Sequence, residues 1–95
     1  MDDIRVGSDN PGMENTDRHT IHLQRIDRAQ NMRRFYNLSI QPTLFGEVSL
    51  IRNWGRIGAA GQTMVETFDR PLDAKTAFLR IERQKIRRGY RDLVG

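Results

Sequence analysis

The sequence contains no cysteine, which excludes a disulfide framework, a thiolate metal site and a cysteine nucleophile. Apolar residues are also scarce: 37% are hydrophobic, against the roughly 45–50% of a usual globular domain, a count that includes glycine. No apolar run approaches the roughly 18–20 residues of a membrane-spanning helix. The first 20 residues lack a basic start followed by an apolar stretch, so no secretory signal is predicted. These absences predict a cytoplasmic protein with no membrane partner, and they leave association with the nucleoid open.

Patterns that carry catalysis or hold cofactors are missing as well. His19 and His22 form a pair, but no third ligand lies at a useful spacing for a metal. The glycine-rich stretch 55–61 lies between two predicted strands rather than before a helix, and it lacks the lysine of a phosphate-binding loop. The 12 carboxylates are scattered. The sequence therefore predicts that the protein is not an enzyme and holds neither a metal nor a cofactor.

Lysine is rare, whereas arginine is abundant. Of the 16 basic residues 14 are Arg, and Lys75 and Lys85 are the two lysines, so that the net charge is +4 against 12 acidic residues. Residues 21–95 hold 14 basic and 7 acidic residues, a net charge of +7. The planar guanidinium matches phosphate and stacks on rings, so this bias favours a polyanionic partner. The alternative is a well-solvated basic surface without a ligand.

The two parts of the chain differ in composition. Residues 1–20 hold five acidic and two basic residues, with Gly, Pro, Asn and Asp throughout and few large apolar groups. Such a composition is typical of disorder. We predict a disordered acidic N-terminal arm over residues 1–20 and a single folded domain over residues 21–95.

Period-2 alternation predicts strands over residues 35–41, 47–54 and 62–68, and a looser pattern predicts a first strand over residues 21–26. Residues 31–34 are polar and are expected to turn the chain. Pro42 ends one strand before a hairpin loop at 42–46. The glycines of the stretch 54–62 predict a bulge or bend at Gly55 and a turn across Gly58–Gly61. Consecutive strands joined by short turns indicate an antiparallel meander.

A helix is predicted over residues 71–89. Pro71 suits its first turn and Gly89 its C-terminal cap. One face of this helix carries apolar residues at i, i+3, i+4 and i+7, with Leu79 and Ile86 widening the stripe; these residues are Ala74, Ala77, Phe78 and Ile81. The fold class predicted is thus α+β, an antiparallel sheet meander of four to five strands with one long α-helix packed on one face.

The stretch Arg52-Asn53-Trp54-Gly55-Arg56 places the only tryptophan between two arginines. An exposed indole can stack on a base, and flanking guanidiniums can hold phosphates on either side. The alternative is that Trp54 is a core residue packed over the helix, because large aromatic residues dominate small cores.

These residues carry a resemblance to a known family. Residues 54–58, Trp-Gly-Arg-Ile-Gly, followed by Gly-Gln at 61–62, resemble the signature of the WGR domain. The aromatic pair at 35–36, the helix residues 74–78 and the Arg-Gly-Tyr ending at 88–90 extend the resemblance over roughly residues 20–93. DNA-dependent poly(ADP-ribose) polymerases contain this domain, and so do small bacterial proteins that consist of little else. The chain resembles the latter.

The resemblance implies the same sheet and helix, and it implies nucleic-acid binding. In the polymerases the Trp of the motif packs against a nucleotide at a DNA break, and the Arg couples DNA contact to neighbouring domains. Transferred to this chain, Trp54 would stack and Arg56 would contact a phosphate or a partner. These 95 residues include no zinc finger, helical regulatory domain or catalytic domain, so the coupling role of Arg56 is lost or is directed at another chain.

The function predicted is a nucleic-acid-binding module for DNA with ends, nicks or single-stranded character, with low sequence specificity. Its predicted contacts are Trp54, Gly55, Arg56, Arg52, Asn53, Gln62, Arg33, Arg34, Arg87, Arg88 and Tyr90. An alternative is a protein–protein interaction module in which the basic face docks a carboxylate-rich partner or the chain pairs with itself; a Trp54 buried under the helix would favour it. A third option is a mononucleotide or ADP-ribose-like ligand at the glycine-rich loop. The oligomeric state is left open.

Overall fold

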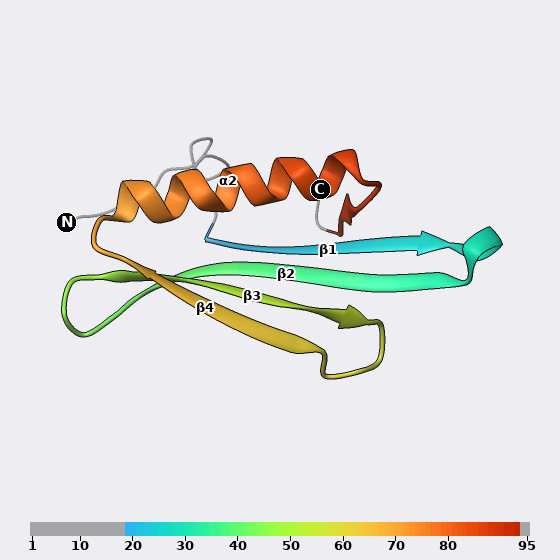
Figure 1. Ribbon diagram of the computed structural model, residues 1–95, viewed down its shortest axis with the longest axis horizontal. Coiled ribbons are helices and arrows are strands. Elements are labelled where there is room, and N and C mark those ends of the chain that lie inside the picture. The colour runs from blue at the N-terminus through green and yellow to red at the C-terminus, as the bar shows by residue number, and fades with distance from the viewer. Residues whose placement is uncertain (1–18, 94–95) are drawn as a thin grey trace.

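The computed structural model describes residues 19–93, so the arm predicted over residues 1–20 lies almost entirely outside the described residues and stays a prediction. A five-stranded antiparallel sheet in the order β4-β3-β2-β1-β5 carries one long helix on one face (Figure 1). Its elements are β1 (Thr20–Asp27), the short 3-10 helix η3 (Arg28–Gln30), β2 (Met32–Pro42), β3 (Val48–Arg56), β4 (Gln62–Phe68), α2 (Pro71–Arg87) and β5 (Arg91–Asp92). The α+β class and the single packed helix are confirmed.

The first turn differs from the prediction. Residues 32–34, which the prediction assigned to the turn, belong to β2, where Met32 pairs with Asp27 and Arg34 pairs with Arg25. The turn lies earlier: the Asp27 carboxylate accepts hydrogen bonds from the backbone N–H groups of residues 29 and 30, and Asn31 adopts a left-handed conformation at φ +52°. A strand end that extends beyond the covering helix buries neither face, so its residues need no apolar alternation. The composition of such a strand end is therefore the same as that of a turn.

The predicted bulge or bend at Gly55 is also wrong. The register of β2 and β3 is continuous through Phe35–Gly55 to Arg34–Arg56, so β3 runs two residues further than predicted. Gly55 is needed for a different reason: a Cβ there would lie 2.8 Å from the Cα of Gly61, in the turn that folds back on it. The predicted turn across Gly58–Gly61 is confirmed by positive φ angles at both glycines.

The core lies between α2 and one face of the sheet. The helix buries Ala74, Ala77, Phe78 and Ile81, as its apolar spacing predicts. Leu79 and Ile86 are 42% and 47% exposed, so the buried stripe is narrower than predicted. Small alanines bring the helix close to the sheet, and side chains a third of a turn away then cannot reach it. Within the described residues no helix is long and apolar enough to cross a membrane.

Substitutions in the turn of residues 57–61 test the close approach of Gly61 to Trp54 and Phe35. A Cβ at Gly61 would collide with the backbone oxygen of Trp54 and lie 2.9 Å from the Phe35 ring, whereas a Cβ at Gly58 would meet nothing within 4 Å. Both glycines have positive φ, so Gly58→Ala reports backbone strain alone and should cost about 1 kcal/mol. Gly61→Ala adds the collision and should lower the free energy of unfolding by about 3 kcal/mol. Urea unfolding measures both, and equal losses would contradict the contact.

Candidate nucleic-acid interface

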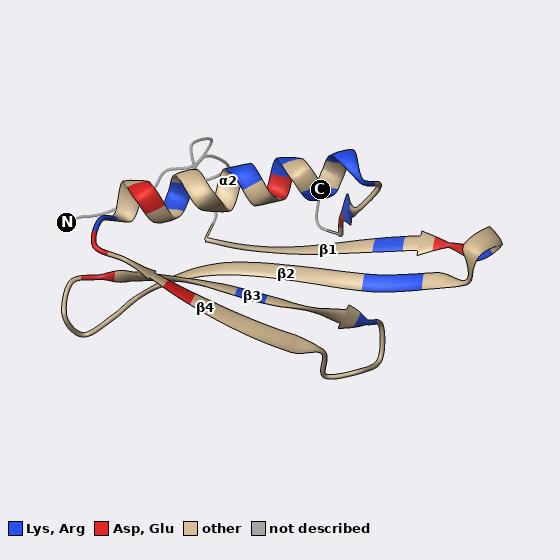
Figure 2. Cartoon of the chain, viewed as in Figure 1, with Lys and Arg blue, Asp and Glu red and all other residues tan. Residues whose placement is uncertain are grey.

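Three arginines form a row across the sheet on the face that carries α2. Arg34 of β2 is paired with Arg25 of β1 on one side and with Arg56 of β3 on the other. Like charges directly opposite each other on neighbouring strands destabilise a sheet. Figure 2 shows basic residues gathered toward this end of the sheet, where β2 begins and β3 ends. An anion bound across the row would relieve the repulsion, which makes the row a candidate phosphate contact.

The next row along the strands is aromatic. Tyr36 lies opposite Trp54, and their ring centroids are 5.9 Å apart at an interplanar angle of 20°. Tyr90, which follows the helix, meets Tyr36 edge-on at 6.2 Å and 75°. Tyr36 and Tyr90 are buried, whereas Trp54 is half-buried at the margin of the core. Trp54 is therefore neither fully covered by the helix nor freely exposed, and the fold fixes its ring by stacking it on Tyr36.

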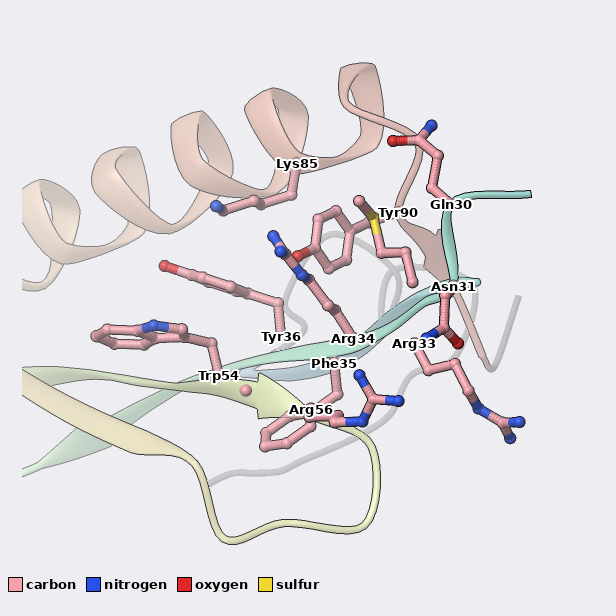
Figure 3. A pocket seen from close by; sticks show the side chains of 12 residues that line it. Gln30, Asn31, Arg33, Arg34, Phe35, Tyr36, Trp54, Arg56, Lys85 and Tyr90 are labelled. Carbon is pink, nitrogen blue, oxygen red and sulfur yellow. The ribbon is translucent and has the colours of Figure 1, made fainter. Parts of the chain in front are cut away.

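Lys85 of α2 covers the aromatic row from above. Its Nζ lies 4.4 Å from the Tyr36 ring centroid and 5.7 Å from that of Tyr90, within the range of cation–π attraction. Figure 3 shows the order Lys85, Tyr36, Trp54 from the helix down to the sheet. Burial lowers the pKa of the Lys85 ammonium below the usual 10.5, and the positive charges of Arg88, Arg52 and Arg34 lower it further.

Arginines, aromatics and lysine together line a cleft of about 450 Å³ (Figure 3). Among residues 19–93, no carboxylate lines it. Six predicted site residues do: Arg33, Arg34, Trp54, Gly55, Arg56 and Tyr90. The cleft also includes six residues that the sequence did not single out as site residues: Gln30, Asn31, Met32, Phe35, Tyr36 and Lys85.

The sequence does indicate that Lys85 faces the sheet. Lys85 follows Phe78 and Ile81 at i+7 and i+4, so it continues the buried stripe of the helix. A lysine in such a position has to lie against the sheet, where its charge meets whatever the strands present. Period-2 alternation over residues 35–41 places Tyr36 on one face with Leu38 and Ile40, and only the register of Tyr36 with Trp54 brings it into the cleft.

Arg52 has a partner inside the protein. Its Nη2 lies 3.4 Å from an oxygen of Glu66 on β4, and its side chain is 25% exposed. Its Nε is buried without a hydrogen-bond partner among the described residues. Arg52 thus contributes positive potential at Lys85 but is already engaged with a carboxylate. Arg87, Arg88 and Gln62 lie outside the cleft lining, although Arg88 is near enough to act on Lys85 electrostatically.

Asn53 points to the opposite face of the sheet and holds the glycine-rich turn. Its Nδ2 donates to the backbone oxygens of Ala60 at 3.2 Å and Gln62 at 3.0 Å. Its Oδ1 accepts from Nδ2 of Asn37 at 3.3 Å, and the Oδ1 of Asn37 lies 2.9 Å from Nδ1 of His22. These assignments require a proton on Nδ1 of His22. The chain of bonds fixes where the turn begins and so how β3 presents Trp54 and Arg56.

A second groove, of about 370 Å³, lies beside this turn. Its lining includes Phe35, Asn53, Ile57 and Leu93 together with His22, and it holds no lysine, arginine or carboxylate among the described residues. A phosphate-bearing ligand therefore finds neither a lysine nor an arginine there. Residues 19–93 also contain no group of three or more His, Cys, Asp or Glu side chains that could hold a metal ion.

Comparison with known proteins gives the family. The model of the WGR domain matches residues 19–94. The chain belongs to the WGR domain family. It is 43% identical over 89 residues to the uncharacterized protein y4dW of Sinorhizobium fredii; the match covers 94% of this chain and 44% of that protein. The chain therefore spans less than half the length of this relative. No solved structure gave a significant match.

The Trp and the Arg of the tripeptide that names the WGR domain lie in different rows of the cleft lining. Trp54 belongs to the aromatic row and Arg56 to the arginine row, while Gly55 lies between them under the turn. Adjacent residues of a strand point to opposite faces, so the Trp and the Arg share a face because one residue separates them. That residue lacks a side chain because Gly61 packs against it.

The lowered pKa of Lys85 has a measurable consequence for stability. A lysine whose pKa is lower in the folded than in the unfolded protein loses its proton first in the folded state, so the unfolded state binds more protons in that interval. The contribution of Lys85 to the free energy of unfolding should therefore rise as pH rises from the lowered value toward 10.5. Urea unfolding of wild type and Lys85→Met from neutral pH to about pH 10 tests this. The wild type should gain stability relative to the variant; parallel profiles would contradict it.

Proposed function

We propose that this WGR domain binds nucleic acid through the cleft between α2 and the start of β2, and that it favours DNA ends, nicks or single-stranded segments. The observation that carries the proposal is the aromatic row beside the arginine row. Trp54 supplies a ring at the margin of the core, and Arg34 and Arg56 flank it with positive charge in a cleft whose described lining holds no carboxylate. Base–aromatic stacking and phosphate contacts are the two interactions on which single-strand binding depends.

The position of Trp54 argues for an unstacked nucleotide. Its ring is half-buried in a cleft and held against Tyr36 rather than projecting from the surface. Such a ring cannot enter the stack of a continuous duplex, whereas a terminal or unpaired nucleotide can enter the cleft. Of the arginine row, Arg34 and Arg56 line the cleft, and they lie on neighbouring strands about 4.8 Å apart. Each DNA strand carries one charge per about 3.4 Å of helix axis, so the pair can contact two successive phosphates.

Low sequence specificity follows from the position of the helix. One face of α2 is buried on the sheet through Ala74, Ala77, Phe78 and Ile81. The helix is therefore unavailable for docking into a major groove with base-reading side chains on that face. Stacking and phosphate contacts tolerate any sequence.

The protein-interaction alternative uses the same positive charge. A carboxylate-rich protein would satisfy the arginine row but would leave the aromatic row without a stacking partner. Competition by polyglutamate at matched charge separates the two functions. Displacement of a nicked duplex at equal ionic strength and equal concentration of charges would favour a protein partner, whereas DNA bound in its presence supports the nucleic-acid proposal.

Arginine substitutions test the phosphate contacts. Arg56→Ala should weaken binding of a nicked duplex and make the dependence of log K on log salt shallower by about 0.9 for each phosphate contact removed. Arg83→Ala is the matched control, because Arg83 is exposed on the outer side of α2 and lies outside the cleft. Fluorescence anisotropy titrations at several salt concentrations measure both. Equal salt slopes for Arg56→Ala and Arg83→Ala would contradict the proposed site.

Removing the indole tests the stacking contact. Trp54→Ala should cost about 1–3 kcal/mol of binding free energy, the usual value for one stacked base, with an unchanged salt slope because no charge is removed. Trp54→Phe keeps a ring against Tyr36 and should recover part of the loss. Circular dichroism and urea unfolding establish that both variants fold. Affinity that is unchanged in a folded Trp54→Ala protein would contradict stacking.

A further inference from the structure

Lys85 has a position in the cleft that phosphate binding alone does not require. Its stem continues the buried stripe of the helix, and its Nζ is held over the ring of Tyr36. The amine therefore lies above the aromatic row, on the side of Tyr36 opposite Trp54 (Figure 3). Lys85, Trp54 and Arg34 line the same cleft of about 450 Å³, so a ligand that fills the cleft contacts the amine as well as the indole.

The surroundings of Lys85 are those that make an amine a nucleophile. Lysines are activated by desolvation in an apolar pocket or by a neighbouring cation. The second condition is met: Nζ lies 4.4 Å from the Tyr36 ring centroid, and partial burial, followed by the positive charges of Arg88, Arg52 and Arg34, lowers the pKa of Lys85. A lower pKa leaves a larger fraction of the amine unprotonated at neutral pH. The same arginines attract phosphate-bearing reactants.

We propose that Lys85 captures the open-chain aldehyde of an abasic deoxyribose at a strand break by forming an imine at Nζ. This inference rests on the proposed function, because the strand break has to occupy the cleft first. The substrate class follows from the lining: arginines for the phosphate that flanks the sugar, an aromatic row for the neighbouring nucleotide, and an amine for the carbonyl carbon.

The reaction balances without a further reactant. The lone pair of Nζ attacks C1′ of the aldehyde, and proton transfer gives a carbinolamine. A proton from solvent, equal to the one that the Lys85 ammonium gave up to become the amine, lets the hydroxyl group leave as water and leaves the protonated imine. One C–N double bond forms, one C–O double bond breaks, and no electron is gained or lost. Strand cleavage would also require a base to remove a proton from C2′. No carboxylate lines the described part of the cleft, so the inference ends at reversible capture.

Reductive trapping tests the inference with the full chain. The probe is a nicked duplex that carries a 5′-deoxyribose phosphate at the nick, present at saturating concentration with sodium cyanoborohydride, which reduces an imine to a stable amine. Wild type should give a covalent protein–DNA product that maps to Lys85. Lys85→Arg, which keeps the charge but is not a nucleophile, should lose the product. Lys75→Arg is the matched control, because it changes the other lysine of the chain, which lies outside the cleft.

The outcomes separate this inference from the proposed function. Binding of an intact nicked duplex is measured for each variant, and Lys85→Met repeats the experiment if Lys85→Arg fails to fold. A product that persists in Lys85→Arg, or that maps to Lys75 or the N-terminal amine, overturns the inference. Wild type that binds the intact nicked duplex but gives no product overturns the inference and leaves the proposed function standing. Wild type that binds neither duplex overturns both.

Discussion

The pairing of Tyr36 with Trp54 is the contact on which the rest of the structure depends. The register of β2 and β3 puts the two rings opposite each other, and their stacking at 5.9 Å ties the WGR strand to the core. Lys85 and Tyr90 reach the same ring from the helix end. A shift of one residue in that register would send Trp54 and Arg56 to the open face of the sheet. The register of β2 and β3 therefore determines both the packing of the core and the lining of the cleft.

On the face of the sheet that carries α2, the type of side chain changes from row to row along the strands. Helix α2 covers the apolar rows, the aromatic row lies at the end of that cover, and the arginine row follows. Placing Arg25, Arg34 and Arg56 opposite one another costs a mutual repulsion. Arg34 and Arg56 line the cleft, whose described lining holds no carboxylate. Where a carboxylate is available, as Glu66 is for Arg52, the arginine is tied to it. Arg52 therefore has a structural role, whereas Arg34 and Arg56 face the cleft.

Much of the fold could be predicted from the sequence because local patterns encode it. Alternation located β2 and β3, and Ala74, Ala77, Phe78 and Ile81 set the buried face of α2. The lining of the candidate site was predicted only in part, because its members meet through register and packing. Arg33, Arg34, Trp54, Gly55, Arg56 and Tyr90 were brought together, whereas Asn53 faces away and Lys85 was missed. No local pattern shows that Gly55 serves a close approach to Gly61 rather than a bulge.

The most direct measurement compares two duplexes of identical sequence, one nicked and one continuous, by titration against the fluorescence of Trp54, the only tryptophan of the chain. Repeating the titration at two salt concentrations separates the contribution of stacking to the binding free energy from that of the phosphate contacts. The account predicts tighter binding of the nicked duplex, quenching of Trp54 by that duplex alone, and affinities for both that fall with salt. Equal affinities with an unchanged Trp54 emission would contradict the claim that the cleft receives an unstacked nucleotide.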